Sequence, residues 1–210
     1  MIIIHHLGIS QSERIVWLCE ELNLPYRLQR YERDPVTRLA PPACGALAPY
    51  GTAPVVEVDG RVLGESGAIV EYLSMEHGGG ALMVPPGDAT YADFLFWFHF
   101  ANGSLVPAAI FDSLAARNKG DQLAQALGAR LERAYNLLEA RLTVSPFLAG
   151  AAFSTADLMN LFPLTTMRLF SPRSLAPYPH LRAYLVRIMA RPAYRRAMDK
   201  AEPGLRITLD

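Results

Sequence analysis

All segments with the pattern of a β-strand lie in the first 77 residues, and the pattern of the chain's second half is helical. Short β-branched or alternating runs predict four strands, at residues 1–6, 26–30, 54–58 and 61–63. Helical or irregular segments are predicted around them, at residues 10–23, 34–47 and 65–76. The Asp59-Gly60 turn joins the last two strands as a hairpin. The first part of the chain is therefore predicted to be a small α/β domain.

A stretch rich in glycine and proline, residues 78–88, separates this part from the rest. Apolar residues at helical spacing then predict helices at residues 89–118, 121–142, 155–170 and 179–201. Ser154 and Asp157 have the spacing of a capping box at the start of the third of these helices. We expect an α/β domain at 1–77, a linker at 78–88 and an all-helical domain at 89–210.

Charge and cysteine content exclude several classes of protein. Lys and Arg together number 20, as do Asp and Glu, so the chain lacks the basic excess of a general nucleic-acid binder. A net charge of zero with 51% hydrophobic residues favours self-association. Cys19 and Cys44 form neither a disulfide framework nor a Cys-x-x-Cys pair, which is typical of a reduced, cytoplasmic protein.

Neither a membrane span nor a metal centre is predicted. Residues 91–111 are apolar enough to raise the question of a span, but polar residues and a proline interrupt them, at Asp93, His99, Asn102, Ser104 and Pro107. A buried helix fits this pattern better. The five histidines are scattered without the spacing of zinc ligands. The first residues lack the basic start and long apolar stretch of a signal peptide.

Two short segments carry local chemistry, each with two interpretations. Ser66 begins a helix and has no Glu or Gln three residues later to form a capping box. It is either a plain N-cap or, with Glu65 as acceptor for an ammonium, part of a site for an α-amino acid head group. Pro54 is either an edge-strand proline or a cis proline that leaves the adjoining backbone free to pair with an extended ligand.

Segments along nearly the whole chain resemble the cytosolic glutathione S-transferases, and in particular serine-type bacterial members. In the first part these segments are residues 6–18, 51–56 and 63–69. In the helical part they are residues 98–104, 153–157, 178–184 and 191–193. The resemblance implies a thioredoxin-like α/β N-terminal domain that carries the glutathione site. It also implies an all-α C-terminal helical bundle that lines the pocket for a hydrophobic electrophile.

The resemblance also implies roles for individual residues. Pro54 matches the family's cis proline, with the Ala53 backbone pairing with the cysteinyl part of glutathione. Glu65 and Ser66 match the pair that holds the γ-glutamyl head group. Ser10 falls where serine-type members carry the hydroxyl that activates the thiol. No Cys sits beside Ser10, which disfavours the cysteine-type members that run disulfide exchange.

Ser12, two residues after Ser10, is the alternative thiol contact and the better candidate for the helix N-cap. Many relatives place a basic or amide residue ahead of the proline to hold the glycyl carboxylate. Residues 45–51 contain no basic residue, so Arg38 or another Arg would have to take that role.

For the second substrate, Phe94, Phe98 and Asn102 are candidate lining residues, although most of the aromatic stripe is expected to pack in the core. Glutathione is implied as a co-substrate with no metal, in a homodimer that contacts neither nucleic acid nor membrane. The implied reaction is conjugation to a hydrophobic electrophile or reduction of an organic peroxide. The alternatives are a non-catalytic protein of the same fold and a glutathione-dependent isomerase or dehalogenase.

Overall fold

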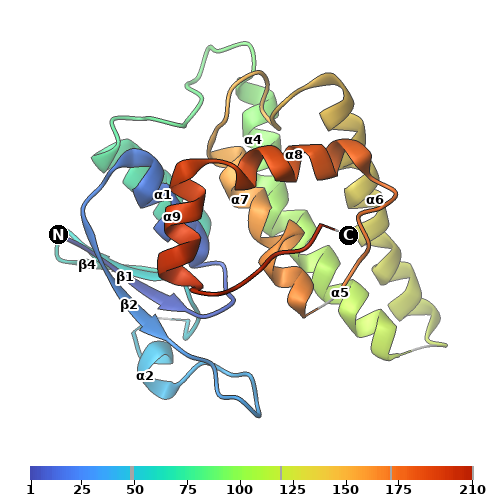
Figure 1. Ribbon diagram of the computed structural model, residues 1–210, viewed down its shortest axis with the longest axis horizontal. Coiled ribbons are helices and arrows are strands. Elements are labelled where there is room, and N and C mark those ends of the chain that lie inside the picture. The colour runs from blue at the N-terminus through green and yellow to red at the C-terminus, as the bar shows by residue number, and fades with distance from the viewer. Residues whose placement is uncertain (48–49, 119, 171, 210) are drawn as a thin grey trace. The chain divides into compact units, whose positions relative to one another are not determined.

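The computed structural model describes residues 1–47, 50–118, 120–170 and 172–209, so Ala48 and Pro49 of the segment before Pro54 lie outside it (Figure 1). The chain folds into two compact units. The first comprises Met1–Met83 with Ala190–Arg206, and the second contains Val84–Met189 and the last residues. The expected division differs in two respects: it made residues 78–88 a separate linker, and it assigned everything after residue 88 to the helical domain.

The first unit is built on a four-stranded mixed sheet with the strand order β2-β1-β3-β4. Its strands are β1 (Ile2–Leu7), β2 (Tyr26–Tyr31), β3 (Val55–Val58) and β4 (Arg61–Leu63). β1 pairs with β2 in parallel and with β3 antiparallel, and Asp59 and Gly60 adopt the positive φ angles of a tight hairpin turn. The helical segments are α1 (Glu13–Leu22), α2 (Pro42–Gly45), α3 (Ser66–Tyr72) and the π-helical turn η1 (Leu73–His77). This is the expected thioredoxin-like arrangement.

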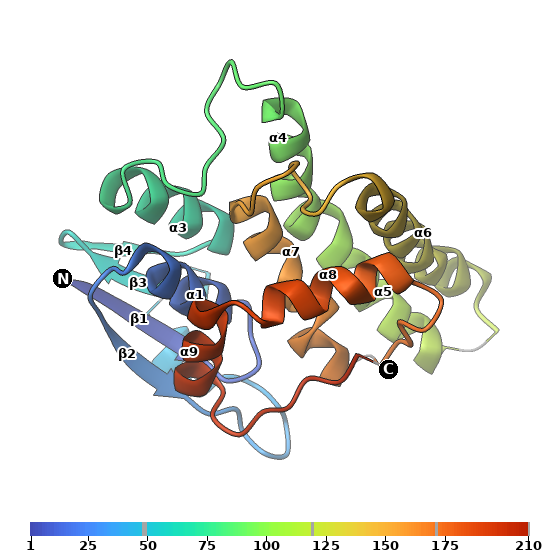
Figure 2. The same cartoon turned by 45° about the horizontal axis from the view of Figure 1, so that its top comes forward.

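A helix from the end of the chain, α9 (Pro192–Ala201), completes the first unit by packing along α1 (Figure 2). The rings of Trp17 and Tyr194 meet edge to face at 5.1 Å between centroids. Glu20 on α1 accepts hydrogen bonds from Arg196 Nε at 2.9 Å and from Lys200. These contacts hold α9 against α1, and the segment after α9 then runs back to the end of β1.

Glu20 gives this packing a measurable pH dependence. Burial acts to raise its pKa, but hydrogen bonds from Lys200, Tyr26 and Arg196 outweigh burial and lower the pKa to about 2. The ionised carboxylate therefore stabilises the fold above the ordinary glutamate pKa of about 4.3, and this contribution fades as pH falls towards 2.

We expect Glu20→Gln to lower the free energy of unfolding at neutral pH by about 2 kcal/mol. This value is smaller than the pKa shift alone implies, because the donor side chains of Arg196 and Lys200 are half exposed and solvent screens their charges. Urea unfolding at several pH values measures this loss, with the exposed Glu76→Gln as control. The account would be contradicted if the difference in unfolding free energy between Glu20→Gln and wild type stayed constant from neutral pH to pH values near 2.

The second unit is helical, as expected. It contains α4 (Tyr91–Phe100), η2 (Ala101–Leu105), α5 (Val106–Arg117), α6 (Gln122–Val144), α7 (Thr155–Leu164), η3 (Thr166–Leu169) and α8 (Pro179–Met189). Every residue of α7 is buried, and α4 packs against it. Within the described part of the chain, the run Tyr91–Arg117 is the one helix that has the length and composition to cross a membrane. Its α5 portion packs along α6.

The start of α7 is organised by one buried carboxylate. Asp157 Oδ2 accepts a hydrogen bond from the Ser154 amide at 2.9 Å, and Oδ1 accepts from the Leu148 amide at 2.8 Å and from Tyr184 Oη at 3.1 Å. Ser154 and Asp157 form the predicted capping box. Asp157 thus connects the helix start to the preceding loop and to α8.

Candidate functional site

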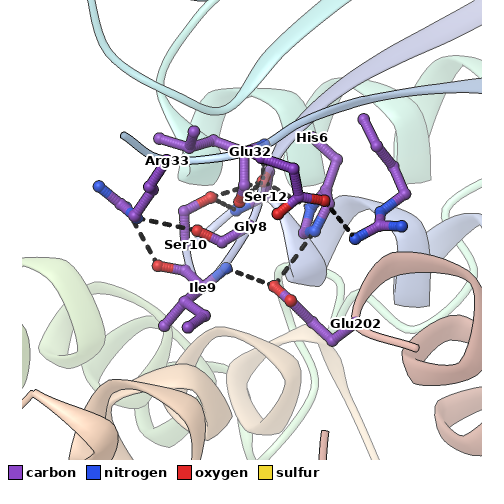
Figure 3. A network of polar contacts seen from close by, with 10 residues as sticks. His6, Gly8, Ile9, Ser10, Ser12, Glu32, Arg33 and Glu202 are labelled. Carbon is purple, nitrogen blue, oxygen red and sulfur yellow. Dashed lines mark hydrogen bonds and ion pairs between the residues drawn. The ribbon is translucent and has the colours of Figure 1, made fainter. Parts of the chain in front are cut away.

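Ser10 lies in the turn between β1 and α1, and this turn is held from two sides (Figure 3). Ile9 has a φ of +53°, a conformation that β-branched residues rarely adopt. Its amide donates to Glu202 Oε1, and its carbonyl accepts from Arg33 Nη2 at 3.1 Å. Arg33 Nε also donates to the Gly8 carbonyl at 2.9 Å. These contacts stabilise the unusual backbone of Ile9 and fix the place of Ser10.

The hydroxyl groups of Ser10 and Ser12 are hydrogen-bonded to each other, with their oxygens 2.6 Å apart. Ser12 Oγ also lies 2.8 Å from His6 Nδ1 and accepts from the Leu7 amide at 3.2 Å. The prediction that Ser12 caps α1 is therefore wrong: it occupies the cap position, but its hydroxyl makes no capping bond and turns back to β1. Ser12 is fully buried, whereas Ser10 retains some exposed surface.

Ser66, the first residue of α3, is connected to the start of α1. Arg14 Nη1 donates to Ser66 Oγ at 3.0 Å, and Ser66 Oγ donates to Gln11 Oε1 at 3.2 Å. Burial lowers the pKa of Arg14 to about 9, against the opposing effect of the Glu13 carboxylate, so the guanidinium stays charged at neutral pH. The sequence predicted neither the contact of Arg14 nor that of Gln11 with Ser66, because neither contact has a sequence signature.

The remaining predicted ligand residues also belong to the first unit. The Ala53–Pro54 peptide is cis, as the resemblance implied. In the register between β1 and β3, His5 lies opposite Val55, so Pro54 lies beside the end of β1 that leads into the Ser10 turn. Glu65 is exposed and has a φ of +63°. The fold thus gathers Ser10, Pro54 and Ser66 around the start of α1.

A cavity of about 370 Å³ lies next to the Ser10 turn, on the side of Gly8 and Ile9. Three of its lining residues are arginines, Arg30, Arg33 and Arg38. Arg38 is the residue that we named as a substitute holder of the glycyl carboxylate. Glu32 and Glu202 also line the cavity, so its arginines outnumber its carboxylates by one, whereas residues 45–51 supply no basic residue.

In the second unit, the aromatic candidates lie in the core. Phe94 and Phe98 are buried, with ring centroids 5.7 Å apart, and Asn102 is half-buried in η2. Burial of the two rings favours core packing, and a role for the three residues in substrate binding stays a prediction. Among the residues that the structure describes, no group of three or more His, Cys, Asp or Glu is arranged to hold a metal ion.

A thioredoxin-like sheet with a cis proline directly before its third strand, followed by an all-helical unit, is the architecture that the resemblance to glutathione transferases implied. Two family models match the chain: "Glutathione S-transferase, N-terminal domain" over residues 10–76 and "Glutathione S-transferase, C-terminal domain" over residues 99–192. The chain belongs to the glutathione S-transferase family.

Individual relatives agree with this assignment over nearly the full length. The chain is 31% identical to glutathione S-transferase 3 of Schizosaccharomyces pombe, over 96% of this chain and 88% of that protein. It is 28% identical to glutathione S-transferase 1 of Saccharomyces cerevisiae, over 94% of each. The crystal structure of a glutathione S-transferase from Actinobacillus pleuropneumoniae superposes with a TM-score of 0.89 at 30% identity, covering 98% of this chain and 94% of that one.

Proposed function

We propose that this glutathione transferase is a serine-type enzyme, similar to bacterial members, that binds glutathione in its first unit and activates the thiol through Ser10. The observation that carries the proposal is the Ser10–Ser12 pair. Ser12 Oγ is occupied by contacts with His6 and Leu7, whereas Ser10 is the outer hydroxyl of the pair. Ser10 is therefore the group that can turn its hydrogen towards a ligand.

Activation of the glutathione thiol requires a modest stabilisation of the thiolate. A free thiol has a pKa of about 8.5 and is mostly protonated at neutral pH, and only the thiolate is a good nucleophile. Lowering that pKa by about two units takes roughly 2.7 kcal/mol. A hydrogen bond to a charged group contributes about 1.5–3 kcal/mol, so one hydroxyl that donates to sulfur accounts for most of the shift.

The rest of the tripeptide is assigned to neighbouring groups. The γ-glutamyl carboxylate meets Ser66, beside the charged guanidinium of Arg14, and its ammonium group meets the exposed Glu65. The backbone of Ala53, next to Pro54, pairs with the cysteinyl part. Arg38 is assigned to the glycyl carboxylate, because it lines the cavity beside the Ser10 turn. The bound thiolate then attacks a hydrophobic electrophile or an organic peroxide.

Calorimetry with Ser66→Ala tests the binding part of this proposal. We expect glutathione binding to weaken about tenfold or more, since a lost hydrogen bond to a charged group is worth about 1.5–3 kcal/mol. Ser74→Ala, which removes a buried hydroxyl elsewhere in the same unit, serves as the matched control and should bind like wild type. Absence of any binding heat in wild type at millimolar glutathione would favour a non-catalytic protein of this fold.

We also propose that the protein is a homodimer of the cytoplasm. Its net charge of zero and the large apolar side chains exposed on α4 and α5, among them Phe96, Ile110 and Leu114, favour association. Both cysteines are free and buried, in keeping with a reducing compartment. Sedimentation at micromolar concentration is expected to give a species of twice 23.1 kDa, and a species at 23.1 kDa would contradict the dimer.

A further inference from the structure

Four buried side chains lie in a row that ends at Ser10, joined by hydrogen bonds between Ser10, Ser12 and His6 and by an ion-pair contact without hydrogen-bond geometry between His6 and Glu202 (Figure 3). Glu202 Oε1 lies 3.2 Å from His6 Nε2, His6 Nδ1 lies 2.8 Å from Ser12 Oγ, and Ser12 Oγ lies 2.6 Å from Ser10 Oγ. His6 comes from β1 and Glu202 from the segment after α9. An imidazole between a carboxylate and a hydroxyl is the arrangement that activates nucleophiles in hydrolases.

We propose that this chain is a proton relay in which His6 is the base for the glutathione thiol, acting through Ser12 and Ser10, while Glu202 stabilises the imidazolium that forms. The proposal rests on the proposed function, because it requires the sulfur of glutathione to meet Ser10. It goes beyond that function by assigning the destination of the thiol proton.

The direction of the hydrogens before transfer follows from the partners of each atom. The carboxylate of Glu202 beside Nε2 favours the neutral ring that carries its hydrogen on Nε2. Nδ1, at 2.8 Å, then accepts the hydroxyl hydrogen of Ser12 in preference to the Leu7 carbonyl, which lies 3.4 Å from Ser12 Oγ. Ser12 Oγ, which also accepts from the Leu7 amide, can accept the hydrogen of Ser10. Every link is thus set to receive a proton from the side of Ser10.

Transfer moves one hydrogen at each link and creates no new charge on the serines. The S–H bond of glutathione breaks and its proton binds Ser10 Oγ, the Ser10 hydrogen passes to Ser12 Oγ, and the Ser12 hydrogen passes to His6 Nδ1. The products are a thiolate, two neutral hydroxyls and an imidazolium paired with Glu202. Ser10 now donates to the sulfur, as thiolate stabilisation requires. After conjugation the reverse transfer returns the proton to water, so that glutathione and the electrophile yield the conjugate, the leaving group as an anion and one proton in the solvent.

Burial explains why Glu202 is needed. His6 is fully buried, and a buried charge without a partner is costly. Glu202 also accepts from the Ile9 amide and so helps to hold the Ser10 turn. Glu202→Gln separates these two roles, since the amide oxygen can still accept from Ile9 whereas the negative charge beside the imidazole is lost. Glu202 acts through His6 and the Ser10 turn, and it is therefore a positioning residue.

The direct test follows the protonation of His6 by nitrogen NMR of histidine-labelled full-length protein. The buffer is slightly alkaline, where histidine is ordinarily neutral. The ligands are glutathione and S-methylglutathione, which lacks the thiol proton, and the His6 signals are assigned by their loss in His6→Asn. We expect His6 to be neutral in the free protein, to become an imidazolium with glutathione, and to stay neutral with S-methylglutathione. In Glu202→Gln, His6 should remain neutral with glutathione, and kcat should fall about 100-fold with little change in KM, within the usual range for loss of general-base catalysis.

Three outcomes would overturn the relay. In the first, glutathione binds and its thiolate absorbance appears, but His6 stays neutral and the thiol proton is released into the solution. This outcome excludes the relay and leaves the proposed role of Ser10 intact. In the second, His6 is already an imidazolium in the free protein and therefore cannot accept a proton. In the third, neither ligand perturbs any signal or gives binding heat, which overturns the proposed function together with the relay.

Discussion

Ser10→Ala is expected to slow conjugation of glutathione to a chromogenic aryl halide more than tenfold at neutral pH. The substitution removes the outer hydroxyl of the Ser10–Ser12 pair, which is the proposed donor to the sulfur. Loss of about two pKa units of thiol activation leaves only a few per cent of bound glutathione as thiolate at pH 7. Part of the loss should return at alkaline pH, where thiolate forms without help.

The measurement is the pH–rate profile of kcat/KM for wild type, Ser10→Ala and Ser10→Thr. The threonine variant retains a hydroxyl at the same position and should recover most of the rate. In Ser12→Ala, Ser10 stays available to donate to the sulfur, but the proposed relay to His6 is interrupted, so the rate should fall in this variant as well. If the pH–rate profile shifts in Ser12→Ala and stays unchanged in Ser10→Ala, the thiol contacts Ser12 and not Ser10.

Asp157→Ala is expected to cause the largest loss of stability, about 3–5 kcal/mol in the free energy of unfolding. The buried carboxylate accepts from the amides of Leu148 and Ser154 and from the hydroxyl of Tyr184. Each donor left buried without an acceptor costs about 1–3 kcal/mol. Such a loss is a large part of the 5–15 kcal/mol that stabilises a typical domain.

Urea unfolding followed by circular dichroism measures this effect. Asp199→Ala is the matched control, because Asp199 is an exposed helical aspartate and its loss should change the stability by about 0.5 kcal/mol or less. Asp157→Asn should fall between the two, since its amide keeps one acceptor oxygen. If Asp157→Ala lost less than about 1 kcal/mol, the carboxylate would not organise the start of α7 as its contacts indicate.

Much of the fold was predictable because it rests on local patterns. The hairpin at Asp59-Gly60 follows from turn chemistry, and the helix beginning at Thr155 follows from the capping box. The partner of α9 was not predictable in this way. Its apolar stripe predicts a buried face, but periodicity does not say which element covers that face, and the covering element is α1.

The same reason limits what the sequence reveals about the site. Ser10, Pro54 and Ser66 belong to short motifs and could be proposed from their spacing and family resemblance. Glu202 has no motif, and it reaches the Ile9 amide across 193 residues of sequence. The role of Ser12 was mistaken for a related reason: a serine before a helix is usually a cap, and its bonds to β1 depend on the tertiary fold.

The structure of the complex with glutathione tests the central claim most directly. The account predicts the sulfur within hydrogen-bonding distance of Ser10 Oγ, the cysteinyl backbone along Ala53 and Pro54, and the γ-glutamyl group against Ser66. A complex with the sulfur remote from Ser10, or with the γ-glutamyl group away from Ser66, would contradict it.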